Sequence, residues 1–170
     1  MDLLIIRHAI AEPRVEDGGT EPDDTQRALT PNGRQRMKRG ARGLYRLHPG
    51  ITLLASSPLV RARQTAEIVA RAYGGISITT VPELATGVGV ESMAAWLRSV
   101  ESAETVAVVG HEPGLGELGS WLLGGSRAQP FITLGKGGAC LVQLPEGAPA
   151  GEGRLAWHAT PKMLRRLGRG

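Results

Sequence analysis

The sequence has 170 residues, a net charge of +4 and 41% hydrophobic residues, which is typical of a folded domain and excludes a disordered or fibrous chain. The single cysteine, Cys140, excludes an intrachain disulfide and a cysteine metal cluster. No apolar run approaches the roughly 18 residues that a membrane span needs, and Asp2 stands where a signal peptide would be basic. We therefore expect one domain over residues 1–170, located in the cytoplasm and without a membrane partner.

The first predicted element is a buried strand, because Leu3–Ile6 is a continuous aliphatic run. The run ends at Arg7 and His8, a cation and an imidazole, which is what a site for an anion would need. Residues 9–29 are polar and rich in Gly, Pro and Asp, which predicts a long loop. Loops of this length are uncommon in compact domains and often functional.

A helix is predicted next, with Thr30 as its N-cap, Pro31 in its first position and its end at Pro49. Its charge is one-sided, because residues 34–46 carry six basic side chains and no acid, whereas residues 12–24 carry six acids against one arginine. The pattern is that of an amphipathic helix whose inner face holds Met37, Ala41, Leu44, Tyr45 and His48.

The basic helix also raises the question of a partner. A basic stretch can bind nucleic acid, but such proteins usually interleave aromatic residues, and Tyr45 is the only one in this run. We therefore expect no nucleic-acid partner. A solvated face, or a docking face for an acidic protein, fits the composition better.

The rest of the chain alternates between strands and helices before it becomes strand-rich. This alternation predicts an α/β protein with three layers (αβα), in which helices cover both faces of a mainly parallel sheet of about six strands, with antiparallel strands at an edge. The predicted strands are Ile51–Ala55, Ile76–Val81, Thr105–Gly110, Phe131–Leu134, Ala139–Leu144 and Arg154–His158. The predicted helices begin at Ser56-Ser57-Pro58, near Glu91 and at Pro113, and Lys162–Arg169 is a short basic helix or a frayed tail.

Several polar side chains follow the strands of this sheet, where ligands bind in such folds. Arg7 and His8 follow the first strand, Glu83 follows the third, and His111 follows the valine-rich strand. Arg61 lies in the first turn of a helix, where a cation is disfavoured unless an anion sits between it and the helix terminus. Two histidines, two arginines and a carboxylate are therefore expected at one edge of the sheet.

These side chains suit a phosphoryl group better than a metal ion. A zinc site would need acidic or thiolate ligands, and clustered arginines repel a cation. Nearby positive charge lowers the pKa of a histidine and keeps the imidazole neutral. A neutral imidazole that faces a bound phosphoryl group can attack phosphorus, while the arginines and the second histidine stabilise the transition state. We expect no metal and no cofactor.

The sequence resembles the histidine phosphatase superfamily, and specifically its SixA-like phosphohistidine phosphatases. The resemblance rests on Ile6-Arg7-His8-Ala9, Arg27 to Gly33, Ser57 to Ala66, Pro82-Glu83-Leu84 and Val109-Gly110-His111-Glu112-Pro113, and it covers nearly the whole chain. It implies a phosphoglycerate mutase-like fold without the large helical insertion of longer members. It also implies that His8 is the residue phosphorylated in the intermediate, and that Arg7, Arg61 and His111 complete the phosphate pocket.

Two positions depart from the superfamily pattern. Ala9 stands where most members have glycine, and Leu84-Ala85-Thr86 stands where many members have the acid that protonates the leaving group. Glu83 is the nearest carboxylate, and it could instead orient Arg7 or cap a turn. A missing acid would suit a phosphohistidine substrate, because an imidazole leaving group can already carry its proton.

The sequence therefore predicts a metal-independent phosphohistidine phosphatase acting on a protein of the histidine-phosphotransfer type through phospho-His8. A small-molecule phosphomonoesterase of the same superfamily is the first alternative. A phosphoprotein-binding module without turnover is the second.

Overall fold

The protein is described here from a computed structural model, which places residues 1–13, 24–125 and 129–169. Six strands form one sheet in the order β3-β2-β4-β1-β5-β6, in which β1 to β4 pair in parallel and β5 pairs antiparallel with both β1 and β6. This confirms the predicted mainly parallel sheet with antiparallel strands at one edge. The strands are β1 (Asp2–Arg7), β2 (Leu53–Ser56), β3 (Ile78–Thr80), β4 (Thr105–Gly110), β5 (Ala139–Gln143) and β6 (Arg154–Ala159).

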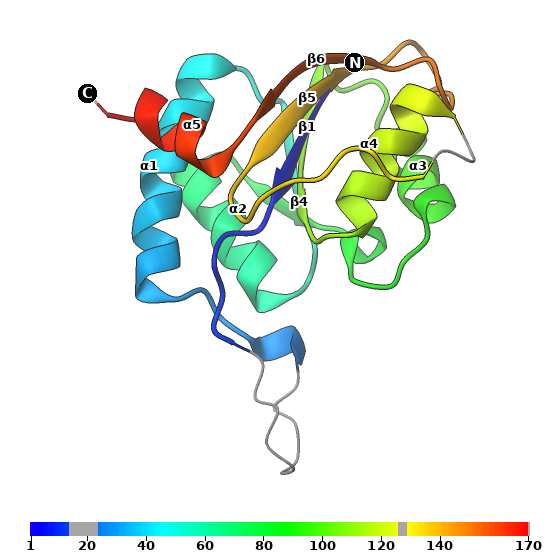
Figure 1. Ribbon diagram of the computed structural model, residues 1–170. Helices are drawn as coiled ribbons and strands as arrows, with labels where there is room; N and C mark the ends of the chain where they lie inside the picture. The colour runs from blue at the N-terminus through cyan, green and yellow to red at the C-terminus, as the bar shows by residue number, and fades with distance from the viewer. Residues whose placement is uncertain (14–23, 126–128, 170) are drawn as a thin grey trace.

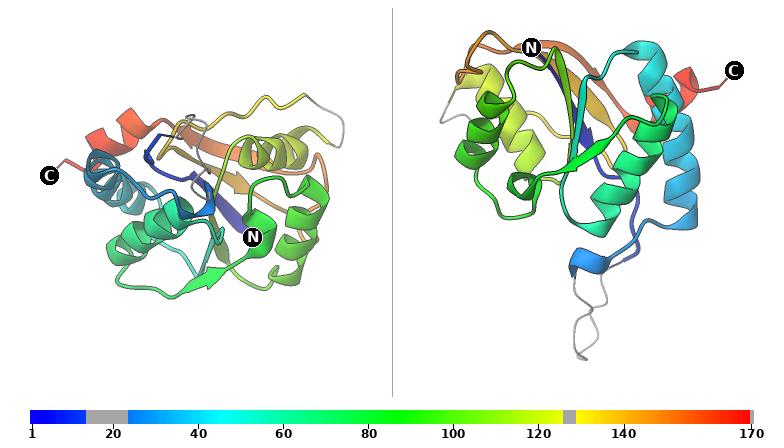
Figure 2. Two further views of the ribbon diagram at one scale, coloured as in Figure 1. Left: turned by 90° about the horizontal axis from the view of Figure 1, so that it is seen from below. Right: turned by 180° about the vertical axis from the view of Figure 1, so that it is seen from behind.

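Helices cover both faces of the sheet, as the sequence predicts (Figures 1 and 2). Because strand side chains alternate between faces, Leu4 and Ile6 pack with α1, α2 and α5, whereas Leu3 and Ile5 pack with α3 and α4. The helices are α1 (Pro31–Leu47), α2 (Val60–Ala72), α3 (Val90–Ser99), α4 (Gly114–Gly124) and α5 (Pro161–Leu167), with short 3-10 turns η1 (Asp24–Gln26) and η2 (Pro82–Leu84). Within the described ranges, no helix is both long enough and apolar enough to cross a bilayer.

Helix α1 begins as predicted, because the Thr30 side chain accepts a hydrogen bond from the backbone of Gly33. Its inner face differs at Tyr45, which is 45% exposed although Leu44 is fully buried, and at His48, which caps the end of the helix and is half-buried. Consecutive helical residues point about 100° apart, so Tyr45 turns away from the direction of Leu44. Tyr45 instead packs edge-on against Tyr73, with ring centroids 5.2 Å apart.

The predicted strand at Phe131–Leu134 is wrong. Phe131 is 56% exposed, and the backbone of this segment is bound by side chains rather than by a neighbouring strand. The backbone N–H groups of Phe131 and Ile132 donate to Ser120 Oγ, and that of Leu134 donates to Glu112 Oε1 at 2.7 Å. Ile132 and Leu134 are nevertheless buried, which is why the pattern resembled a strand.

Helix α5 packs closely along α1. A Cβ added at Gly43 of α1 would collide with the carbonyl oxygen of Leu164 in α5, so glycine is required for this approach. Of the two forms predicted for Lys162–Arg169, the short basic helix is therefore confirmed, and it is docked on α1 with Leu164 fully buried.

The predicted long loop is described only at its two ends. Glu12 N donates to the carbonyl of Ala28, and Ala11 bridges Leu29, so the two ends lie side by side. Residues 14–23, which hold most of the predicted acidic stretch, lie outside the described residues.

Candidate active site

The two histidines expected at the edge of the sheet lie next to each other. His8 follows β1 and His111 follows β4, and these strands are parallel neighbours. The backbone N–H of His8 donates to the carbonyl of Gly110, which continues the pairing of the strands into the site. The centroids of the two imidazole rings are 5.1 Å apart, and each residue is 5% exposed.

The environment of His8 determines which of its nitrogens is reactive. Its Nδ1 lies 2.7 Å from its neighbour's carbonyl oxygen, that of Ala9, and since a carbonyl only accepts, Nδ1 carries the proton. The lone pair of the neutral ring is then on Nε2. Burial, followed by the positive charges of Arg61 and Arg7, lowers the pKa of His8 to about 4, against the opposing effect of the Ala9 hydrogen bond. His8 is therefore neutral at pH 7.

His111 is held by the loop after β2. Its Nε2 lies 2.8 Å from Ser57 Oγ, and the backbone of Ser57 donates to Val109 beside it. Burial lowers the pKa of His111 to about 3, and the neighbouring charges of His8 and Arg61 act in the same direction. Its Nδ1 is buried and has no hydrogen-bond partner in the described part of the chain. An unpartnered buried nitrogen of this kind indicates a position for a ligand.

Arg61 lies in the first turn of α2 and is only 2% exposed. Its guanidinium donates to the backbone carbonyl of Asp24 at 2.7 Å and to Asp24 Oδ2 at 2.9 Å. The other carboxylate oxygen of Asp24 accepts from Arg27 Nε at 3.0 Å. The cation that the sequence predicted to need an anion is therefore paired with a carboxylate from η1.

Arg7 is oriented from the opposite side of the site. Its guanidinium donates to the carbonyl of Leu134 at 2.6 Å, and Glu112 holds that segment through the Leu134 N–H. The Nε of Arg7 is buried and unpartnered among the described residues. With Ser57 Oγ donating to His111 Nε2, the proton of the neutral His111 ring lies on Nδ1, and Nδ1 and Arg7 Nε would then be two buried N–H groups that an anion could accept from.

Glu83 does not join this group. It lies in η2, and within the described chain it makes no side-chain hydrogen bond and no ion pair. Arg7 is oriented by a backbone carbonyl instead, so the structure gives no support to Glu83 as its partner. The carboxylate that pairs with an arginine of the site is that of Asp24, and Glu112 lies next to His111 and lines the same cavity.

Two cavities lie near the histidines, one lined by His111 and the other by Ala9, the residue after His8. One, of about 330 Å³, is lined by residues that include Leu84, Met93 and His111. The other, of about 540 Å³, is lined by Ala9 and by basic side chains of α1, of α5 and of the segment before β5, which carries Lys136. Among the described residues, no group of three or more His, Cys, Asp or Glu side chains could hold a metal ion.

Sequence reasoning did not single out some residues that shape the site. Ser57 and Glu112 lie inside the motifs and next to strand ends, and this position could have identified them as residues of the site. Thr65 accepts from the backbone N–H of Ala9 and donates to the carbonyl of Arg61, so it joins β1 to α2. Thr65 also lies inside the Ser57 to Ala66 motif, but its sequence position alone does not reveal that it joins two elements.

Comparison with known proteins agrees with this architecture. Residues 3–86 match the family model of the histidine phosphatase superfamily (branch 1). An uncharacterized protein of Picosynechococcus sp. is 35% identical over 150 residues, 87% of each chain. The structure of the protein histidine phosphatase SixA complexed with tungstate superposes with a TM-score of 0.81 at 27% identity, over 95% of this chain and 98% of that one.

This chain belongs to the histidine phosphatase superfamily. Its structure is similar to that of SixA, and the expected phosphoglycerate mutase-like α/β fold is confirmed. The α-ribazole phosphatase of Shigella flexneri shares the fold, with a TM-score of 0.74 at 16% identity over 95% of this chain and 97% of that one. The same fold therefore accompanies both a protein phosphatase and a phosphatase named for a small molecule.

Proposed function

We propose that this protein is a phosphohistidine phosphatase that hydrolyses phosphohistidine on a protein substrate through a covalent phospho-His8 intermediate. The observation that carries the proposal is the hydrogen bond from His8 Nδ1 to the Ala9 carbonyl. It leaves the lone pair of a buried, neutral imidazole on Nε2, beside Arg7, Arg61 and His111. A neutral imidazole is the nucleophilic form.

In the first step, His8 Nε2 attacks phosphorus, the new N–P bond forms and the bond between phosphorus and the substrate imidazole breaks. The displaced imidazole leaves with its bonding electron pair, which becomes the lone pair of a neutral ring if the ring already carries a proton on its other nitrogen. Arg7, Arg61 and His111 Nδ1 donate to the phosphoryl oxygens, where negative charge spreads in the transition state.

In the second step, water attacks phospho-His8, the N–P bond breaks, and inorganic phosphate leaves with His8 restored. The hydrogen bond to Ala9 holds the ring in one orientation through both steps, since the Nδ1 proton is never transferred. Neighbouring His111 is held in place by Ser57.

The charge distribution supports an imidazole leaving group over an alkoxide. The two oxygens of Asp24 accept from Arg61 and Arg27, and those of Glu112, next to His111, accept from the backbone N–H groups of Gly116 and Leu134, so both carboxylates are engaged as acceptors. Among the described residues, Glu83 makes no hydrogen bond and no ion pair with the histidines or arginines. An alkoxide leaves poorly without a general acid, which is typically worth about 10²–10⁴-fold in rate.

A small-molecule phosphomonoesterase is the second candidate. The observation that favours it is the cavity of about 330 Å³ beside His111, which lies within the size range of small-ligand sites. A small alcohol leaving group would occupy this cavity while its phosphate faced His8.

The test compares kcat/KM for a phosphohistidine-bearing histidine-phosphotransfer domain, free phosphohistidine and a panel of alkyl phosphates. We expect the phosphoprotein to be preferred, and His8→Ala to abolish turnover while the far-UV circular dichroism stays unchanged. Acid-labile phosphate trapped on His111 instead of His8 would overturn the assignment of the nucleophile. A preference for an alkyl phosphate would replace the proposed substrate with a small molecule.

Activity is also proposed to be independent of a metal. EDTA should leave the rate on phosphohistidine unchanged, because the phosphoryl charge is met by arginine and histidine N–H groups. The measurement is the rate before and after exhaustive dialysis against EDTA. A rate restored only by added zinc or magnesium would contradict the mechanism.

A further inference from the structure

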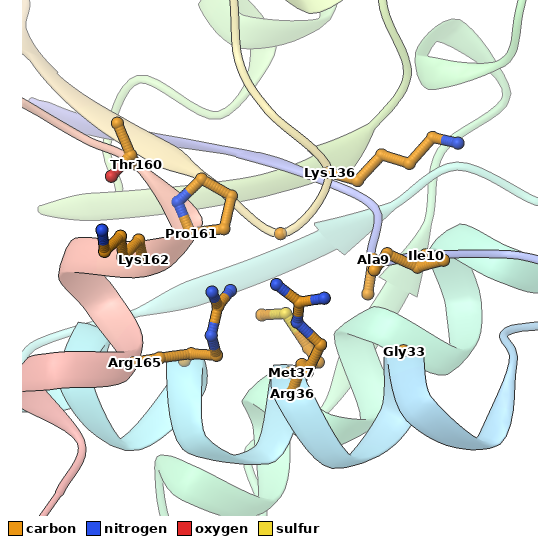
Figure 3. Close-up of a pocket in the computed structure, with 12 residues that line it drawn as sticks. Ala9, Ile10, Gly33, Arg36, Met37, Lys136, Thr160, Pro161, Lys162 and Arg165 are labelled. Carbon is orange, nitrogen blue, oxygen red and sulfur yellow. The ribbon is translucent and has the colours of Figure 1, made fainter.

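A basic groove lies beside the candidate active site, between α1 and α5 (Figure 3). Its cavity has a volume of about 540 Å³ and is lined by four cationic side chains: Arg36, Lys136, Lys162 and Arg165. The described residues that line it include no carboxylate. Ala9, the residue after the proposed nucleophile, forms part of its wall.

The cations of the groove are not paired with acids of the described residues. In the described part of the chain, none of the four forms an ion pair with a carboxylate. In Figure 3, the guanidinium groups of Arg36 on α1 and Arg165 on α5 project into the same space. Burial, followed by the charges of Arg36, Arg169 and Arg39, lowers the pKa of Arg165. Like charges gathered around one hollow repel each other unless an anion lies between them.

The walls of the groove are held at a fixed separation by the packing of α1 on α5. Neither Gly43 nor Gly168 has room for a Cβ, because each faces a backbone carbonyl of the other helix region. The floor is closed by Met37, which is 2% exposed. The basic side chains are therefore presented by a preformed surface, which lowers the cost of binding.

The groove also lies within electrostatic reach of the proposed nucleophile. The charge of Lys136 contributes to the lowered pKa of His8. A substrate whose phosphohistidine reaches His8 would thus place the residues around it over the groove. Beyond the groove, α1 and α5 carry further exposed cations at Arg39 and Arg166.

We propose that this basic groove binds acidic side chains that flank the phosphohistidine of the substrate protein. The proposal rests on the function proposed above and specifies the partner of the same site. The groove continues onto two basic helix faces, so its charge extends well beyond the size of a small anion, which favours a protein surface as occupant. Complementary charge of this kind raises the rate of encounter and fixes the orientation of a partner.

The test uses two variants of equal charge. The groove variant carries Arg36→Gln and Arg165→Gln, and the control variant carries Arg42→Gln and Arg71→Gln, which lie together between α1 and α2 on another side of the protein. Binding is measured by fluorescence anisotropy with a labelled hexaglutamate peptide. Inorganic pyrophosphate and a single-stranded uridine oligonucleotide of equal length serve as comparison ligands.

We expect the groove variant to weaken the binding of hexaglutamate about tenfold, and the control variant by less than about twofold. Equal weakening in the two variants, or none in either, would overturn the groove as the site. Tighter binding of the oligonucleotide or of pyrophosphate than of hexaglutamate by the wild-type protein, lost in the groove variant, would assign the groove to nucleic acid or to a small anion instead.

A turnover measurement separates this proposal from the proposed function. On the phosphohistidine protein, the groove variant should raise KM about tenfold with kcat unchanged, whereas its kcat/KM on free phosphohistidine should equal that of wild type. Loss on both substrates alike would contradict a docking role. If the wild type hydrolysed neither substrate, the proposed function would fail, and the peptide measurement would still decide whether the groove binds acidic side chains.

Discussion

Acidification from pH 7 to pH 5 should destabilise this protein mainly through His8 and His111. Both imidazoles are buried, with pKa values of about 4 and about 3, whereas the ordinary value is 6.5. Above pH 6.5 both rings are neutral in the folded and the unfolded chain, so they contribute no pH dependence. Between pH 6.5 and their folded pKa values, the unfolded chain binds a proton at each ring and the folded protein does not. Stability therefore falls as the pH is lowered through this window.

The magnitude follows from the same pKa values. At pH 5 an unfolded histidine is almost fully protonated, while either buried ring is still mostly neutral, so each ring costs roughly 2 kcal/mol relative to pH 7. The two together give a loss of about 4 kcal/mol, which is a large fraction of the stability of a typical domain.

The assay is urea unfolding at pH 7 and pH 5, for wild type and for a His8→Gln/His111→Gln variant. Carboxylates protonate alike in both proteins, so the difference between the two pH-dependent losses isolates the imidazoles. We expect wild type to lose about 4 kcal/mol more than the variant. If both proteins lost the same stability within about 0.5 kcal/mol, the reasoning about buried neutral rings would be refuted.

Two further predictions concern packing and positioning. Gly43→Ala should destabilise the protein by about 1–3 kcal/mol, because the added methyl group meets the Leu164 carbonyl. Gly40→Ala should instead stabilise α1 by up to about 1 kcal/mol, because a Cβ there meets nothing within 4 Å. Thermal unfolding of both variants checks this prediction, and equal shifts in Tm would contradict it. Ser57→Ala should lower kcat on phosphohistidine about tenfold, because it removes the hydroxyl that holds His111. Ser56→Ala is the control and should leave kcat unchanged, because the Ser56 hydroxyl donates to the backbone carbonyl of Ser57. Similar kcat values for the two variants would exclude the positioning role of Ser57.

The placement of the site could be predicted from the sequence because it depends on strand order and strand ends. Arg7, His8 and His111 each follow an apolar run directly, and parallel strands bring their carboxyl ends to one edge. Arg61 could be identified because it is a cation in the first turn of a helix, where the helix dipole disfavours positive charge.

The parts that the sequence did not reveal depend on contacts without a local pattern. Asp24 and Arg61 are 37 positions apart in the sequence. The composition of the loop that holds Asp24 does not indicate which of its acids would contact Arg61. The segment at Phe131 alternates like a strand, but Ser120 and Glu112 take its backbone donors, and those contacts have no signature in the segment itself. Tyr45 is exposed because it points away from the direction of its buried neighbour Leu44 on α1. The apolar pattern of the sequence alone did not show which of the two residues is buried.

A last prediction concerns the ion pair between Asp24 and Arg61, because the Asp24 carboxylate binds the guanidinium that a phosphoryl group is proposed to bind. The carboxylate oxygens lie 2.9 Å from the Arg61 guanidinium and 3.0 Å from that of Arg27, at the edge where the phosphoryl group is proposed to bind. A bound phosphate must then share Arg61 with a negative charge or displace it. Asp24→Asn removes the charge and keeps the shape.

We expect Asp24→Asn to bind inorganic phosphate about five- to tenfold more tightly than wild type, a modest gain because the Asp24 side chain is 35% exposed and solvent screens it. The matched control is Glu67→Gln, which removes an exposed carboxylate paired with Arg63 on the same helix as Arg61 and should leave phosphate affinity unchanged. Isothermal titration of the three proteins with phosphate measures the effect. Weaker binding by Asp24→Asn would show instead that Asp24 aligns Arg61 for the anion, and that the carboxylate assists phosphate binding rather than competing with it.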